Sequence, residues 1–140
     1  MEFKVRKIED SDWSTLVSWW QSWGWPAAPE KDFLPNNGKG GFLILDKKDN
    51  TPICAGFIWI SIASVTAHIN FIVSNKEYRK KPQRTDAITF LIAMLEEFAK
   101  KQGMKYIYTN SNSKHLQKRF ESFDYVYGSK TIDQVKKLWY

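Results

Sequence analysis

The fold is decided by one continuous stretch of the sequence, residues 66–99, which reads TAHINFIVSNKEYRKKPQRTDAITFLIAMLEEFA. Its first eight residues alternate in a way that predicts a β-strand over 66–73. One face of that strand would carry Ala67, Ile69, Phe71 and Val73. The other face would carry His68, Asn70 and Ile72, since successive side chains of a strand point in opposite directions. Polar chemistry is therefore expected on the face of His68 and Asn70.

The second half of this stretch has the periodicity of a long helix. Thr85 or Asp86 can accept hydrogen bonds from the free amides of a first turn, so the helix is expected to begin there. Its apolar residues recur at the spacing of one helical face. They are Ala87, Ile88, Leu91, Ile92, Leu95, Phe98 and Ala99. The stretch is therefore a strand–loop–helix unit.

The loop between the strand and the helix is rich in positive charge. Its basic residues are Lys76, Arg79, Lys80, Lys81 and Arg84, against the single acidic residue Glu77. A loop that enters a helix presents unpaired backbone amides at the positive end of the helix dipole, an arrangement that binds phosphate. The residues alone support two interpretations, a pyrophosphate-bearing ligand or a solvated basic loop without a ligand.

Further strands and helices are expected on both sides of this unit. Periodicity and turn residues predict strands at 3–8, 42–45, 53–62, 105–109, 125–127 and 131–138 and helices at 12–22 and 113–123. A loop rich in proline and glycine occupies residues 26–41. No internal repeat or linker divides the chain, so a single domain is expected over residues 1–140.

The composition excludes several classes of protein. The 140 residues carry a net charge of +6 and are 43% apolar, as in a globular domain. Cys54 stands alone, which excludes an intramolecular disulfide and a multi-cysteine zinc site, and no metal is expected. The longest apolar segment, residues 53–65, is shorter than the ~20 residues of a membrane helix. With no signal-peptide pattern at the start, a cytoplasmic protein without a membrane partner is expected.

Three segments together resemble the GNAT acetyltransferase superfamily. They are Ile72-Val73-Ser74-Asn75-Lys76-Glu77-Tyr78-Arg79, residues 85–95 and residues 116–125. The chain is most similar to small phage-encoded GNAT-like proteins, with which it shares Trp19-Trp20, Trp23 to Pro26 and Leu34 to Gly41. The resemblance implies an α/β (α+β) GNAT fold. Such a fold has a mixed, mostly antiparallel, twisted sheet of six or seven strands, three or four flanking helices, and a splayed strand pair that forms the cofactor notch.

The resemblance also implies acetyl-CoA as the cofactor. Arg79 matches the first position of the family's pyrophosphate loop, whereas Pro82 and Arg84 stand where the family has small residues. Because Pro82 lacks a backbone donor, phosphate binding is expected to depend more on side-chain charge than on amides. The expected cofactor contacts are Ile72, Val73, Arg79, Lys80, Lys81, Gln83, Arg84, Thr85, Asn112 and Ser113. For Asn112 and Ser113, capping of the helix at 113–123 is the alternative role.

The acid–base residues implied by the resemblance depart from the family pattern. Asn70 stands where GNAT enzymes often place a glutamate base, so the candidate base is His68 on the same face, or a water molecule held by Asn70. A strand histidine satisfied by a backbone carbonyl is the alternative. Phe120 replaces the tyrosine that protonates the departing thiolate, and Tyr125 or Tyr127 is its candidate substitute. The acceptor site is expected to be lined by Trp20, Trp23 and Trp25.

The implied reaction is direct transfer of an acetyl group from acetyl-CoA to an amine, by a monomer or homodimer. Two other functions remain open. Residues 76–140 carry fourteen basic and seven acidic side chains, whereas residues 1–75 carry seven and eight. This excess of charge fits a GNAT-shaped module that has lost catalysis and binds nucleic acid or a host protein. It also fits an acyltransferase that acts on DNA or a nucleotide.

Overall fold

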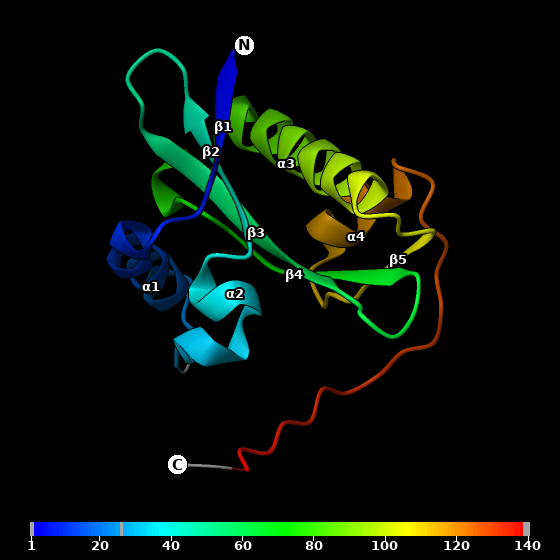
Figure 1. Ribbon diagram of the computed structural model, residues 1–140. Helices are drawn as coiled ribbons and strands as arrows, with labels where there is room; N and C mark the ends of the chain where they lie inside the picture. Colours follow the sequence, from blue (N-terminus) through cyan, green and yellow to red (C-terminus); the bar gives the residue numbers. More distant parts are fainter. Residues whose placement is uncertain (1, 26, 139–140) are drawn as a thin grey trace.

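The structure is a computed structural model that describes residues 2–25 and 27–138. Its centre is a five-stranded sheet in the order β1-β2-β3-β4-β5 (Figure 1). The strands are β1 (Phe3–Lys7), β2 (Gly41–Asp46), β3 (Pro52–Ile60), β4 (Thr66–Ser74) and β5 (Tyr106–Thr109). Only the last pair, β4 and β5, is parallel. The mixed, mostly antiparallel α+β fold is therefore confirmed, with fewer strands than the expected six or seven.

Helices cover both faces of this sheet. They are α1 (Trp13–Ser22), α2 (Pro35–Gly38), α3 (Pro82–Lys101) and α4 (Lys114–Glu121), with short 3-10 turns η1 (Asp10–Asp12), η2 (Lys31–Phe33) and η3 (Lys76–Tyr78). The α3 and α4 helices pack on one face, and α1 and α2 lie on the other (Figure 1). The apolar spacing of α3 explains its place, since Leu91, Ile92 and Leu95 are fully buried against the sheet. Trp20 of α1 is equally buried on the opposite face.

The α3 helix begins three residues before the expected start at Thr85. Lys81 has an extended backbone, as residues before proline usually do, and Pro82 takes the first helical position. Proline is tolerated there because the amide of that position has no partner inside the helix. Gln83, Arg84 and Thr85 therefore belong to the first helical turn instead of the loop, and Pro82 does not interrupt the helix entrance.

A β-bulge interrupts β4 at Phe71. The pairing of β4 with β3 places Phe71 and Ile72 together opposite Gly56. Phe71 has a φ of 58°, the left-handed conformation of a G1-type bulge, which costs a non-glycine residue about 1–3 kcal/mol. The extra residue reverses the faces beyond it, so Phe71 and Val73 pack on the α1 side and Ile72 on the α3 side. The alternation expected from the sequence is therefore wrong from Phe71 onward.

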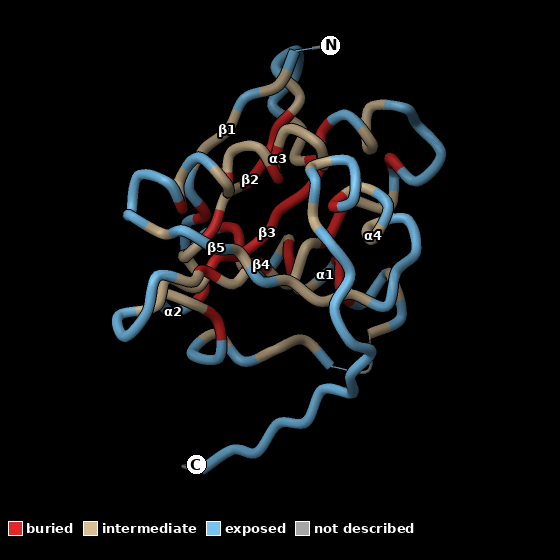
Figure 2. The backbone as a smooth tube through the Cα atoms, turned by 90° about the vertical axis from the view of Figure 1, so that its right-hand side faces the viewer, coloured by how far each residue is buried: buried red, intermediate tan, exposed pale blue. Residues whose placement is uncertain are grey.

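The last two expected strands do not form. Residues 125–138 have no helix or strand and are mostly exposed (Figure 2). In the segment 131–138 the apolar side chains Ile132, Val135 and Leu138 recur every third residue. A strand needs a repeat of two to gather its apolar side chains on one face, so pairing would bury only part of this set. The missing strands account for the smaller sheet.

A bidentate ion pair fixes the start of α1 against β1. The Arg6 guanidinium donates to both carboxylate oxygens of Asp12, at 2.7 and 2.8 Å. The backbone amide of Glu9 donates to the same carboxylate at 2.8 Å. Asp12 is one of the buried polar residues of the described chain. The hydrogen bonds from Arg6 lower the pKa of the Asp12 carboxyl, more than burial raises it.

We expect Asp12→Asn to destabilise the fold by about 1–2 kcal/mol at neutral pH, because Arg6 loses its charged partner but keeps access to solvent. A lowered carboxyl pKa in the folded state gives a stabilisation that is complete above the unfolded pKa of about 3.9 and is lost as the pH falls through the lower folded value. Urea unfolding between pH 7 and pH 2 should therefore converge for the two proteins in acid. Asp10→Asn, which breaks only an exposed pair with Lys31, is the control. A constant difference at all pH values would contradict this assignment.

Candidate functional site

The parallel strands β4 and β5 separate part of the way along β4. Their pairing ends at Ile69 and Thr109, where the Thr109 hydroxyl donates to the Ile69 carbonyl at 2.8 Å. Beyond this point β4 continues to Ser74 with β3 on one side and no strand on the other. Asn75 donates to Ile53 of β3, so by antiparallel alternation the backbone groups of Ser74 and Ile72 face away from β3. The splayed pair thus exposes backbone donors and acceptors, among them the amide of Ile72, whereas the backbone of Val73 faces β3.

Two polar side chains of β4 meet at a residue just beyond β5. Asn110 Oδ1 lies 3.0 Å from His68 Nε2 and accepts from Asn70 Nδ2, also at 3.0 Å. Asn110 Nδ2 donates to the Asp133 carboxylate at 3.1 and 3.3 Å. Asn70 Oδ1 accepts from the backbone amide of Phe71 at 2.7 Å. The structure therefore joins His68 and Asn70, as their shared face predicted, and adds Asn110 and Asp133.

This network determines which nitrogen of His68 carries a proton. A carboxylate only accepts and a backbone amide only donates, so Asp133 and Phe71 fix the orientation of both asparagine amides. Asn110 Oδ1 must then accept from His68, whose Nε2 carries the hydrogen. In the neutral ring the lone pair lies on Nδ1, which makes no hydrogen bond with the residues that the structure describes. Nδ1 is therefore free to accept a proton from another molecule.

Aromatic side chains surround His68 on the α1 side of the sheet. Its ring lies 5.4 Å from Trp59 and 5.2 Å from Tyr108, measured between centroids. The wall continues from Trp59 to Phe71, at 6.1 Å. Phe71 also contacts Trp25 at 5.8 Å and Phe33 at 5.7 Å. Of the three tryptophans expected at the acceptor site, Trp25 thus lies on this wall.

The other two tryptophans have different surroundings. Trp20 has no exposed surface and is a core residue between Trp13, Trp25 and Phe57, so it is out of reach of a ligand. Trp23 lies at the end of β4, where its indole Nε1 donates to the Ser74 carbonyl at 2.7 Å. Trp23 therefore belongs to the cation-rich end of the splayed strands.

Two cations of the loop lie over the Trp23 ring. Lys76 Nζ is 5.3 Å and the Arg84 guanidinium 5.8 Å from the ring centre. Lys76 also donates to the Ser22 carbonyl at the end of α1, at 2.7 Å. Arg84 makes no ion pair with any described residue. The end of β4, the end of α1 and the first turn of α3 are thus held together, with the Arg84 guanidinium unneutralised among them.

The rest of the basic loop remains open to solvent. Arg79, Lys80 and Lys81 are exposed, and Lys81 Nζ lies 4.8 Å from the centre of the Tyr78 ring. In the first turn of α3 the amide of Arg84 donates to Lys81. The Gln83 amide has no protein acceptor in the part of the chain that the structure describes. The helix entrance therefore offers a free amide beside cations, which is the donor set that a phosphate ester requires.

Asn112 and Ser113 lie at the start of α4. The Ser113 side chain accepts from the Leu116 amide at 3.3 Å, so the capping role is confirmed. Asn112 is exposed and makes no hydrogen bond with the described residues. The asparagine that the site uses is instead Asn110, two residues earlier. Its position next to the end of β5 is the one signal in the sequence that could have identified it.

Tyr125 lies away from this group of residues. Its ring packs on Phe120 at 4.9 Å, and it borders a cavity with Glu96 and the beginning of β5 at Tyr106. The splayed strands part at the other end of β5. Burial, followed by the nearby Glu96 carboxylate, raises the pKa of the Tyr125 phenol. The structure therefore does not bring Tyr125 to His68 or Asn70.

Two other site types have no support in the described residues. No group of three or more histidine, cysteine, aspartate or glutamate side chains within 2–25 and 27–138 could hold a metal ion. Cys54 is fully buried, and burial raises the pKa of its thiol, so it does not supply a reactive thiolate. None of the described helices combines the length and apolar character needed to span a bilayer.

Comparison with solved structures identifies the fold. The chain superposes on an acetyltransferase from Trypanosoma brucei with a TM-score of 0.66 and 15% identity, over 96% of this chain and 100% of that chain. It superposes on the acetyltransferase AAC(6')-Iy, solved with a CoA bisubstrate analogue, with a TM-score of 0.65 and 12% identity, over 98% and 99%. It superposes on glucosamine-6-phosphate N-acetyltransferase from Arabidopsis thaliana with a TM-score of 0.60 and 15% identity, over 99% of each chain.

Sequence comparisons add nothing to this result. No protein-family model matches the chain. No curated protein matches it either. The similarity to the solved structures therefore establishes the GNAT acetyltransferase fold, which the resemblance of the sequence implied, and leaves the activity to be argued from the site.

Proposed function

We propose that this protein is an acyl-CoA-dependent N-acetyltransferase with a small-molecule amine as acceptor. The observation that carries the proposal is the separation of β4 from β5 beyond Ile69 and Thr109, next to the cation-rich start of α3. The splay supplies a strand edge for an extended ligand, and the helix start supplies charge for a diphosphate. Both features lie on a fold shared with acetyltransferases, one of them solved with a CoA bisubstrate analogue.

The residues present fit CoA. Its diphosphate would be held by Arg79 and Arg84 and by the free amide of Gln83. Lys80, Lys81 and Thr85 flank this point, and the outward backbone of Ile72 would pair with the amide-containing arm. Val73 contributes packing instead, because its side chain is buried on the α1 side. In this proposal the basic loop would bind the phosphates mainly through side-chain charge.

Acetyl-CoA supplies an activated thioester, which an amine attacks directly at the carbonyl carbon while the carbon–sulfur bond breaks. His68 Nδ1 accepts the proton that the attacking nitrogen loses. The Ile72 amide donates to the carbonyl oxygen as negative charge develops on it. Asn110 orients the His68 ring, and the aromatic wall excludes water from it. Proton return to the thiolate is left to solvent, since Tyr125 lies away from the site.

The proposal is tested by calorimetric titration with acetyl-CoA and CoA, followed by thiol release with a panel of amines. Saturable binding of acetyl-CoA and amine-dependent thiol release are expected. Absence of heat at millimolar acetyl-CoA would overturn the proposal. Binding of duplex DNA that weakens steeply with salt, without acetyl-CoA binding, would instead support the nucleic-acid module.

A further inference from the structure

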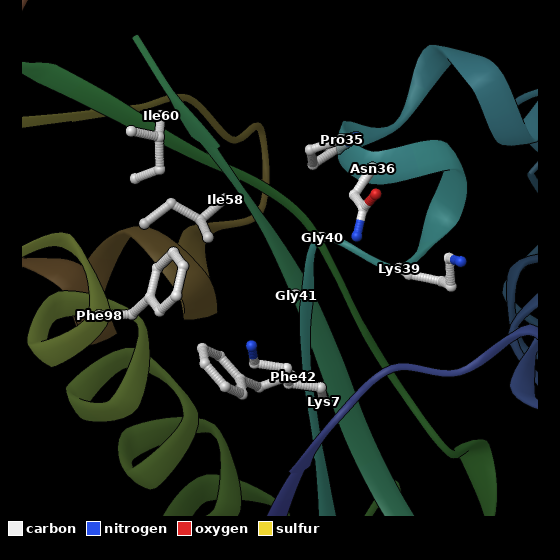
Figure 3. Close-up of a pocket in the computed structure, with 10 residues that line it drawn as sticks. All are labelled: Lys7, Pro35, Asn36, Lys39, Gly40, Gly41, Phe42, Ile58, Ile60 and Phe98. Atoms are coloured by element: carbon white, nitrogen blue, oxygen red, sulfur yellow. The ribbon is translucent and has the colours of Figure 1, made fainter. Parts of the chain in front are cut away.

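A second cavity lies at the end of the sheet where β2 begins (Figure 3). Its volume is about 240 Å³. One wall is apolar and consists of Phe42, Ile58, Ile60 and Phe98. Ile58 and Ile60 flank Trp59 on β3 and point to the opposite face, so the apolar wall of this cavity lies on the other face of the sheet from the His68 site.

The α2 turn forms the other wall of this cavity and is firmly held. The Gly40 amide donates to the Pro35 carbonyl at 2.8 Å, and the Gly40 carbonyl accepts from Ile58 of β3 at 3.0 Å. Gly41 approaches β3 so closely that a Cβ there would lie 2.0 Å from the Gly56 carbonyl oxygen. The cavity is therefore preformed, which lowers the entropic cost of binding a ligand.

Lys7 borders the cavity, is exposed to solvent and brings a positive charge to its rim. Its ammonium group makes no hydrogen bond or ion pair with residues 2–25 or 27–138. In Figure 3 the side chain of Lys7 extends along Phe42 toward the apolar wall. Lys39 also borders the cavity without a partner in the same ranges, but its ammonium points away from that wall in Figure 3. A cation beside an apolar surface favours an anion that carries hydrocarbon.

We propose that this cavity binds a small amphipathic carboxylate, independently of the acetyl-transfer site. The hydrocarbon part would lie against Ile60 and Phe98, which forms an edge contact with Phe42 at 5.6 Å. The carboxylate would accept a charge-assisted hydrogen bond from Lys7. An uncharged molecule of the same shape would forgo that bond, and the exposed Lys7 ammonium would stay hydrated. Selectivity for the acid over its amide is therefore the property that defines the site.

The test is calorimetric titration of the full chain with 3-phenylpropionate and with the neutral 3-phenylpropionamide. The acid should bind saturably at millimolar concentrations, and the amide should bind at least about tenfold more weakly. Lys7→Met, which keeps the aliphatic stem, should weaken binding of the acid by a similar factor, and Lys39→Met should not.

Phe98→Trp fills the cavity without changing its charge and should also abolish binding of the acid. The proposal would be overturned by equal affinities for the acid and the amide, by an unchanged affinity for the acid in Lys7→Met, or by the absence of saturable binding of the acid. Circular dichroism of each variant confirms that it is folded. Acetyl-CoA binding, measured on the same samples, is expected to be unchanged, so the fate of this proposal does not bear on the proposed acetyltransferase activity.

Discussion

Replacing His68 by alanine is expected to lower kcat/KM for acetyl transfer by about 10²–10⁴-fold, the usual contribution of a general base. The variant removes the imidazole whose Nδ1 lone pair, left free by the network with Asn70, Asn110 and Asp133, is proposed to accept the amine proton. The affinity for acetyl-CoA, which is assigned to the basic loop, should stay within about threefold. Thiol release under subsaturating amine measures kcat/KM, and calorimetry measures the affinity for acetyl-CoA.

His115→Ala is the matched control, because His115 is the other histidine of the chain and is exposed on α4. A reaction that depends on His68 as a base should also recover in the alanine variant as the pH is raised, since the amine then loses its proton to solvent. Wild-type activity in His68→Ala, or equal losses in both variants, would show that His68 is a structural strand residue.

The parts of this fold with one regular period could be predicted from the sequence. The spacing of Leu91, Ile92 and Leu95 predicted the buried face of α3, and Ser113 marked the start of α4. The start of α3 was predicted three residues too late, because Thr85 and Asp86 both suit a helix start and a proline at the first helical position looks the same in the sequence as a proline in a loop. Helix starts are therefore less certain than helix faces.

The bulge at Phe71 could not be predicted, because its left-handed backbone is typical of glycine and the strand reads as regular. The network around Asn110 escaped prediction for a different reason. Asn110 lies 40 residues from Asn70 and 23 residues from Asp133 along the chain. Only the parallel register of β4 and β5 and the path of the exposed C-terminal segment bring the three together, and neither leaves a local pattern.

The basic loop provides the second large effect. Changing both Arg79 and Arg84 to glutamine is expected to raise the Kd for acetyl-CoA by about 100-fold, about tenfold for each charge-assisted contact. Neither guanidinium has an ion-pair partner among residues 2–25 and 27–138, so the exchange should cost little stability. The effect should also shrink as salt rises, since exposed charges are screened.

A comparison of ligands shows where these charges act. Acetyl-pantetheine carries the same thioester and arm as acetyl-CoA but no diphosphate, so its Kd should be the same for the wild-type protein and the double variant. Lys100→Gln, at the opposite end of α3 from Arg84, controls for the loss of charge alone and should leave both ligands unaffected. If acetyl-CoA and acetyl-pantetheine lose affinity equally, the variant has disturbed the splayed strands and the phosphate assignment is wrong. If acetyl-CoA alone is weakened, the cations at the start of α3 hold the diphosphate, as the proposed path of the arm along β4 toward His68 requires.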